Sequence, residues 1–217
     1  MLFSYGKTYN LNSLKLGNSF IAVTDTIKFL GIYIDQHLNF RSHISATSNK
    51  ISKVNDLLFR LNNILPTESL YLMYSALLVP HITYGIEIWH GALQANRDRI
   101  FKLQKKAVRA INCLPYNDHT HEYFKSMNIL KVDDLHKLRM CTYMFKNRNA
   151  LSHADIHSHN TRNRNNLIIP RYNKSRSQSS WLYRGILEWN SLPEDTKKIN
   201  SPNAFKNSIR RTVLNDY

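Results

Sequence analysis

Two patterns of apolar residues divide the chain near residue 40. Before it, short β-branched and aromatic runs alternate with turn residues, a pattern typical of strands. We predict three or four short strands, around residues 2–4, 14–16, 20–23 and 28–34. Turn residues at Gly17-Asn18 predict a hairpin between the second and third of these runs. The first 40 residues therefore predict a small antiparallel sheet.

After residue 40, apolar residues recur at spacings of three and four, which places them on one face of a helix. The first helix is expected over residues 43–63, with Ile44, Ile51, Val54, Leu58 and Leu61 on its inner face. Further helices are expected over residues 67–89 with a kink or break at Pro80, and over 97–114, 118–127, 132–145, 181–192 and 202 onward. The whole pattern predicts an α+β fold that is mostly α.

Composition changes again between Asn147 and Ser179. This stretch is dense in Asn, Ser, Arg and Lys, and Asp155 is its one acidic residue, so it predicts a basic linker that allows a strand at 167–169. We therefore expect four regions: a sheet remnant at 1–40, a helical region at 41–146, the linker at 147–179 and a C-terminal helical subdomain at 180–217.

The chain is strongly basic. Thirty Lys and Arg residues against fifteen Asp and Glu give a formal charge of +15, which favours a partner that carries phosphate. In the helix expected at 97–114, one face carries Arg99, Lys102, Lys105, Lys106 and Arg109. That face has no acidic residue, so a lattice of helical ion pairs does not account for it. A solvated surface and a phosphate-binding surface both fit the pattern.

A second group of cations lies in the linker. Arg171, Lys174 and Arg176 stand near Tyr172, and aromatic rings can stack on nucleobases while cations bind phosphate. For these linker cations we favour nucleic acid as the partner. For Trp189, farther along the chain, we favour a position in a small helical core.

Motifs for catalysis or metal binding are absent from the sequence. It contains no Gly-rich phosphate loop, no GxSxG and no HExxH. The adjacent acidic pairs, Asp133-Asp134 and Glu194-Asp195, stand at expected helix starts, where the helix dipole favours them. Ten histidines and two cysteines do not reach the spacing of a zinc site, so we expect no cofactor in this chain. No secretory signal and no apolar run of about 20 residues occurs, so we expect an intracellular protein, nuclear or cytoplasmic, without a membrane partner.

An ordered series of short motifs runs along nearly the whole chain. It comprises Lys28-Phe29-Leu30-Gly31-Ile32, Ile34-Asp35, Leu38-Asn39-Phe40, His43-Ile44, Leu70-Tyr71, Pro80, Tyr84-Gly85, Trp89, Gln104-Lys105-Lys106-Ala107-Val108-Arg109, His119-Thr120, Trp189-Asn190-Ser191-Leu192-Pro193 and Ser201 to Phe205-Lys206. In order and spacing, the series resembles the C-terminal part of the reverse transcriptase of jockey-like non-LTR retrotransposons.

The resemblance implies part of a right-hand polymerase. In that family the segment matching Lys28, Phe29, Leu30 and Gly31 belongs to the primer grip, and the following helices form a thumb that tracks the template–primer duplex. The implied partners are an RNA/DNA hybrid or other nucleic acid, and the palm and fingers of the parent polymerase. As the last remnant of a palm sheet, the strand should leave Phe29, Ile32 or Ile34 poorly covered.

The polymerase carboxylates of this family lie in a Tyr/Phe-x-Asp-Asp motif on the palm, and this sequence has no such motif. Asp25 and Asp35 do not stand in it, and Mg²⁺ would belong to the absent palm. We therefore expect a truncated element, or its 3′ end, that binds a duplex but is inactive alone. Two alternatives remain: a stand-alone nucleic-acid-binding or interaction protein that uses the basic linker, and a relic without selected function.

Overall fold

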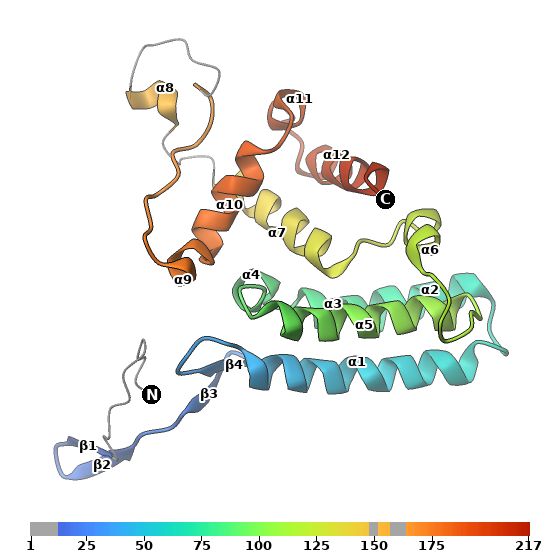
Figure 1. The fold of residues 1–217 in the computed structure, drawn as a ribbon, viewed down its shortest axis with the longest axis horizontal. Coiled ribbons are helices and arrows are strands. Elements are labelled where there is room, and N and C mark those ends of the chain that lie inside the picture. Colours follow the sequence, from blue (N-terminus) through green and yellow to red (C-terminus); the bar gives the residue numbers. More distant parts are fainter. Residues whose placement is uncertain (1–12, 148–151, 157–163) are drawn as a thin grey trace.

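A computed structural model describes residues 13–147, 152–156 and 164–217, and it confirms an α+β fold that is mostly helical (Figure 1). The expected strand at 2–4 lies outside the described residues. Strands β1 (Ser13–Leu16) and β2 (Ser19–Ala22) form the expected hairpin. Gly17 has a φ of +61°, a left-handed conformation that glycine adopts without steric cost.

The expected single strand over residues 28–34 is wrong. The chain instead forms a second hairpin from β3 (Thr26–Phe29) and β4 (Ile32–Asp35), and the two hairpins are separate two-stranded sheets. Leu30 and Gly31 make the turn with φ values of 45° and 82°, and two positive values in a two-residue turn suit the twist of a hairpin. Leucine rarely adopts this conformation, so the pattern did not reveal the turn. The Tyr84 hydroxyl donates a hydrogen bond to the Leu30 carbonyl oxygen and so supports it.

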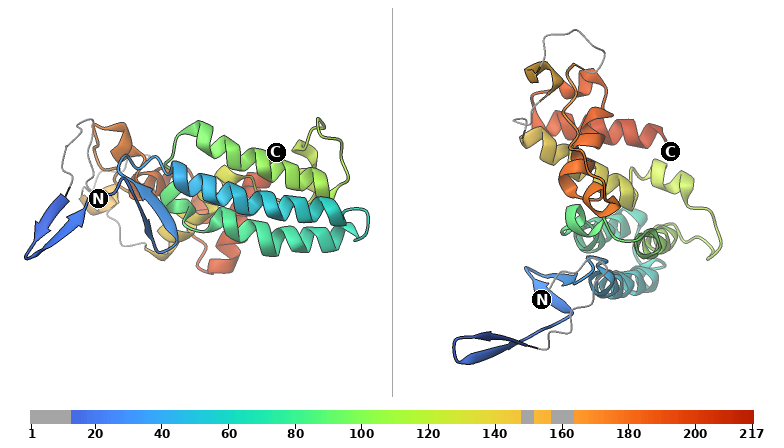
Figure 2. Two further views of the ribbon diagram at one scale, coloured as in Figure 1. Left: turned by 90° about the horizontal axis from the view of Figure 1, so that it is seen from below. Right: turned by 60° about the vertical axis from the view of Figure 1, so that its left-hand side comes forward.

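Helix α1 (Arg41–Leu61) lies between two other rods, which Figure 2 shows side by side. One rod is α5 (Gln94–Ile111); the other is the run of α2 (Thr67–Met73), the π-helical η1 (Tyr74–Leu78) and α3 (Val79–Thr83). Ile44, Ile51 and Leu58 are buried between them, which confirms the predicted apolar face of the first helix.

Pro80 does not break its helix. The disturbance comes earlier, as the π-helical turn η1, in which the Val79 N–H bonds the carbonyl of Tyr74, five residues before it. The chain leaves the helix only at Tyr84, and Gly85, with a φ of +61°, starts the short helix α4 (Ile86–Trp89). The rod therefore runs through the proline and ends at Thr83, and residues 86–89, which were expected in the same helix, form the separate helix α4.

A second layer covers α3, α4 and α5. Helix α6 (His121–Ser126) leads to α7 (Val132–Lys146), on which α10 (Trp181–Asn190) and α12 (Pro202–Asn215) pack (Figure 1). The Phe205 ring lies 4.5 Å from that of Phe145 and 5.8 Å from that of Trp189, measured between centroids. Trp189 is buried, so the prediction that it is a core residue is confirmed.

The basic stretch before α10 contains more packed structure than its composition predicts. It includes the short helices α8 (His153–Ile156) and α9 (Ser175–Gln178), and α11 (Glu194–Lys197) follows α10. The strand allowed at 167–169 is reduced to a single antiparallel bridge between Ser152 and Leu167. The Asn190 side chain bonds both the N–H and the carbonyl of Leu167 at 2.9 Å, and the Leu167 side chain is buried. Within the described parts of the chain, no helix is long and apolar enough to cross a bilayer.

Candidate nucleic-acid interface

A groove of about 580 Å³ follows the contact between α5 and α1. Its lining residues are Ser48, Ser52, Ala95, Arg99, Lys102, Leu103, Lys105, Lys106, Arg109, Tyr116 and Asn117. All five cations predicted on this helix face are among them, and no lining residue is acidic. We call this surface the α5 groove.

The sequence of α5 fixes which side faces the groove. Ile100, Ala107 and Ile111 are buried on the inner side of the helix. Gln104, also fully buried, donates hydrogen bonds to the Tyr74 hydroxyl at 2.9 Å and to the Leu130 carbonyl at 2.8 Å. Because a buried amide keeps its partners, these bonds set the rotation of the helix and leave its cationic side outward.

Helix α1 contributes small polar residues to the other wall of the α5 groove. Ser48 and Ser52 line it, and the Ser48 hydroxyl is buried with no hydrogen-bond partner in the described structure. Next along α1, the Asn55 amide donates to the Leu103 carbonyl at 2.9 Å and fastens the two helices together. Short side chains let the helices approach closely, so the long cationic side chains of α5 dominate the groove.

The charges of the α5 groove are positioned by neutral groups. The Lys105 ammonium lies 5.0 Å from the Phe101 ring centroid, and the Lys106 ammonium lies 5.9 Å from that of Tyr116. Arg109 Nε donates to the Asp118 carbonyl oxygen at 3.0 Å. None of the five cations forms an ion pair with a carboxylate among the described residues. Their charge is therefore available to an anionic ligand.

The second hairpin borders another groove on the opposite flank of α1. This hollow of about 370 Å³ is lined by Lys28, Gly31, Tyr33, His43, Ala46, Thr47, Lys50, His81 and Tyr84. Lys50 points about half a turn around α1 from Ser48 and Ser52, because each residue advances about 100°. Burial lowers the pKa of His43 and of His81, and nearby Lys50 lowers both further, so Lys28 and Lys50 carry the charge here.

The predicted primer-grip residues occupy the tip of this hairpin but do not all line the groove. Lys28 and Gly31 do, whereas Phe29 and Leu30 project outward with 58% and 76% of their surfaces exposed. Ile32 is buried and Ile34 is half-buried. The expectation that at least one of Phe29, Ile32 and Ile34 is poorly covered is therefore met by Phe29.

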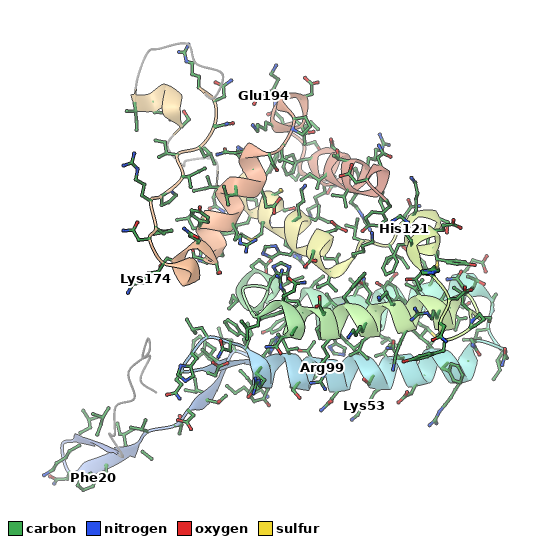
Figure 3. All side chains as sticks on the ribbon, in the orientation of Figure 1. Phe20, Lys53, Arg99, His121, Lys174 and Glu194 are labelled. Carbon is green, nitrogen blue, oxygen red and sulfur yellow. The ribbon has the colours of Figure 1, made fainter. Side chains whose placement is uncertain are left out.

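The linker cations lie elsewhere. Arg171 and Lys174 are exposed ahead of α9, and Arg176 lies within α9, where its side chain is outside the described structure. Neither Arg171 nor Lys174 lines either groove. Figure 3 shows Lys174 in the layer of α9 and α10, above the layer that carries Arg99. The structure thus brings the α5 cations together and leaves the linker cations apart.

Several groove residues did not stand out in the sequence. Lys50 was hidden in a mixed polar run, and Tyr116 follows α5 in a loop, so neither forms a periodic pattern with the cations. The run of Ser45, Ser48 and Ser52 at spacings of three and four was the one available signal, since small residues on a helix face mark a close neighbour.

The acidic pair at the start of α7 has structural partners. Asp133 Oδ1 lies 2.7 Å from His90 Nε2 and 3.4 Å from an Arg97 guanidinium nitrogen, and Asp134 accepts a hydrogen bond from the Tyr217 hydroxyl. The His90 bond holds the pKa of the Asp133 carboxyl below its usual range. Both acids stand in the first turn of α7, as predicted. Among the described residues, no cluster of His, Cys, Asp or Glu could hold a metal ion.

Comparison with known proteins identifies a class: the curated relatives are RNA-directed DNA polymerases from mobile elements of Drosophila. The probable RNA-directed DNA polymerase from transposon BS of Drosophila melanogaster is 31% identical over 110 residues, which cover 49% of this chain and 12% of that protein. The polymerase from mobile element jockey of Drosophila funebris is 27% identical over 123 residues, covering 55% of this chain and 13% of its own length. Its Drosophila melanogaster counterpart is 25% identical over 132 residues, with 59% and 14% covered.

These matches confirm the resemblance to reverse transcriptases of jockey-like non-LTR elements. The matched region spans about one eighth of the relatives' length. No family model matches the chain, and no solved structure matches it significantly.

Proposed function

We propose that this chain contributes template–primer binding to an RNA-directed DNA polymerase of a jockey-like element, and that the α5 groove holds the phosphate backbone of an RNA/DNA hybrid. The observation that carries the proposal is the groove itself, in which five cations meet without an acidic residue. The relatives, named as RNA-directed DNA polymerases, supply the nucleic-acid partner.

The groove suits backbone binding without base readout. Lysine and arginine side chains that repeat along a helix can follow successive phosphates, and such contacts position a protein on nucleic acid without reading sequence. Each neutralised phosphate releases counterions, so binding should weaken steeply as salt rises. The second groove, with Lys28 and Lys50, supports a further contact near the primer end.

The proposed role excludes chemistry by this chain alone. The sequence has no Tyr/Phe-x-Asp-Asp motif, and Asp133 and Asp134 are engaged with His90 and Tyr217. In this proposal, the palm and fingers that carry the catalytic carboxylates and Mg²⁺ pack near the two hairpins. Exposed apolar side chains there, including Leu16 at 69% and Phe20 at 72%, support that placement.

The test measures hybrid binding against salt. In wild type, the logarithm of affinity should fall linearly with the logarithm of salt concentration, with a slope of about 0.7 to 0.9 per contacted phosphate. Changing Lys102, Lys105, Lys106 and Arg109 to Gln should lower affinity on the order of a hundredfold at low salt and flatten the slope.

The matched control removes four cations elsewhere. Lys198, Lys206, Arg210 and Arg211, exposed on α12 and just after α11, are changed to Gln, which lowers the net charge by the same four units. This variant should keep nearly all the affinity. Equal losses in both variants would show that net charge, and not the α5 groove, drives binding, and no hybrid binding by wild type at low salt would refute the proposal.

The second candidate is a stand-alone nucleic-acid-binding protein that uses Arg171, Lys174 and Arg176. In its favour, Arg171 and Lys174 are exposed beside a ring pair, Tyr172 and Tyr183, whose centroids lie 5.8 Å apart. Deleting the linker would remove the buried Leu167 and damage the core, so the informative variant changes the three cations to Gln. Under this alternative, that variant loses hybrid binding and the α5 variant retains it.

A further inference from the structure

The α5 groove continues past the end of the cationic row into a smaller pocket. This pocket, about 220 Å³, is lined by Asn55, Asp56, Phe59, Asn62, Lys106, Arg109, Ala110, Leu114 and Tyr116. Lys106, Arg109 and Tyr116 line both hollows, so the pocket adjoins the α5 groove. A strand whose phosphates lie along α5 would therefore reach this pocket with its next nucleotide.

Two aromatic rings at the pocket are exposed to an unusual degree. Phe59 on α1 has 70% of its surface exposed, and Tyr116 in the loop after α5 has 74%. Neither ring is needed for the core, and exposing a large apolar ring gains nothing for folding. The Lys106 ammonium lies 5.9 Å from the Tyr116 ring centroid, which places a phosphate-binding charge beside a stacking surface.

Two asparagines, Asn55 and Asn62, line the pocket beside the rings. Asn55 is 8% exposed, and its Nδ2 is committed to the Leu103 carbonyl, whereas its Oδ1 has no partner among the described residues. The buried Oδ1 of Asn62 likewise has no partner in the described structure. Both oxygens are shielded from solvent, so the two amides help to shape the pocket, and its exposed rings and cations are the groups that can contact a ligand.

We propose that this pocket binds one unpaired nucleobase of the strand whose phosphates occupy the α5 groove, with Phe59 and Tyr116 stacking on the base. The inference rests on the proposed function, because it assumes that a nucleic-acid backbone lies along α5. In this arrangement, the end of the α5 groove coincides with the last base pair of the duplex. Lys106 and Arg109 hold the phosphate between the last paired nucleotide and the first unpaired one, and the aromatic pocket holds the unpaired base.

The test compares three RNA/DNA hybrids of identical sequence. The first is blunt. The second carries one unpaired adenine nucleotide, placed at one end or the other in separate measurements, and the third carries an abasic nucleotide in place of that adenine. Wild type should bind the adenine-bearing hybrid about tenfold more tightly than the abasic one, as expected for one stacked base. Phe59→Ala should lose this preference and bind the blunt hybrid like wild type. Tyr116→Ala should also lose the preference, and Tyr116→Phe, which keeps the ring, should retain it.

The control is Phe20→Ala, which removes an equally exposed ring on β2, far from the pocket (Figure 3). It should keep the full preference for adenine over the abasic site. If wild type binds hybrids with a steep salt slope but shows no such preference, or if Phe59→Ala retains it, the base pocket is refuted and the duplex groove stands. If wild type binds no hybrid, both proposals fail.

Discussion

Two arginines on α5, Arg97 and Arg99, differ in whether a carboxylate compensates their charge. Arg97 is bonded to His90 at 3.2 Å and to Asp133 at 3.4 Å, and its side chain is 17% exposed. Arg99, two residues later, lines the α5 groove with no carboxylate partner in the described structure. Because two residues turn a helix by about 200°, the neighbours face opposite sides. One charge serves packing, and the other is left for a ligand.

The contrast extends to the surroundings of each arginine. Around Arg97 lies a cluster that we call the histidine junction, formed by His90, Arg97, Asp133 and His136 where α4 and α5 meet α7. The rings of His90 and His136 stack with centroids 3.8 Å apart, and both are buried. Charges in the histidine junction are thus compensated or neutralised, whereas those in the α5 groove are not. Changes in the junction should alter stability, and changes in the groove should alter binding.

The largest expected effect is acid destabilisation through His136. Burial, with His90 and Arg184 nearby, lowers the pKa of His136 from 6.5 to about 3. Between pH 6.5 and about 3, His136 is protonated in the unfolded chain but neutral in the folded chain. The free energy of unfolding is therefore highest above pH 6.5 and falls as pH drops from there toward 3. The pKa of His90 is also lowered, by burial foremost, and acts in the same direction. The resulting loss in the free energy of unfolding should be on the order of a few kcal/mol.

Chemical denaturation at a series of pH values measures this effect. His136→Phe, which keeps a flat ring but cannot titrate, should flatten the decline below pH 6.5. His119→Gln, at an exposed position ahead of α6, is the control and should leave the pH profile unchanged. A wild-type stability that is level from pH 6.5 to 4 would show that the histidine junction is open to solvent.

A smaller effect is expected from Asp133→Asn. The change removes the carboxylate that bonds His90 and Arg97, and since the Asp133 side chain is 65% exposed, the loss should be limited to about 1 kcal/mol of unfolding free energy. Hybrid affinity should not fall. The matched control is Asp98→Asn on α5, whose carboxylate accepts a hydrogen bond from the Gln94 amide at 2.8 Å and has no ion pair among the described residues. Weaker hybrid binding by Asp133→Asn would show that the histidine junction contributes to binding as well as to stability.

Local patterns predicted most of the helices. The apolar spacing of α1 and the charged face of α5 follow from a period of 3.6 residues, and both survive in the structure. The Leu30-Gly31 turn could not be foreseen, because a hydroxyl from Tyr84, 54 residues away, supports a strained leucine. The break allowed at Pro80 is also absent, and the irregular turn of the rod lies earlier, at the π-helical η1. In both places a non-local or irregular hydrogen bond overrides the local pattern.

Only part of the candidate site could be predicted from the sequence. The row of α5 cations could be predicted because charge repeats along one helix, whereas the wall formed by Ser48 and Ser52 depends on which helix packs against which. The resemblance motifs proved to be largely structural. Gln104 and Asn190 bond buried backbone or side-chain groups, and Phe205 fills the core. Three of the five groove cations, Lys105, Lys106 and Arg109, stand in the same motif as Gln104, so the motif on α5 combines core residues and groove residues.

The smallest expected effect is a change in stability caused by repulsion among the cations of the α5 groove. It tests directly whether these cations, unlike those of the histidine junction, lack a partner within the fold. Lys102 has three like charges at spacings of three or four, Arg99, Lys105 and Lys106, against one acid, Asp98, so repulsion outweighs attraction at this position. Lys102→Gln should therefore raise the unfolding free energy by about 0.2 to 0.5 kcal/mol at low salt. The gain should shrink toward zero near 1 M salt, where screening acts within about 3 Å.

The control for this change is Lys53→Gln on α1 (Figure 3), because Lys53 has an acidic residue, Asp56, three positions later. Lys53→Gln removes that attraction together with the repulsion from Lys50, three positions earlier, so it should leave stability nearly unchanged at low salt, unlike Lys102→Gln. Urea denaturation of both variants at low and high salt separates the two cases. A loss of stability in Lys102→Gln would mean that the groove cations already have a partner within the fold, and the groove would then be a second structural cluster like the histidine junction.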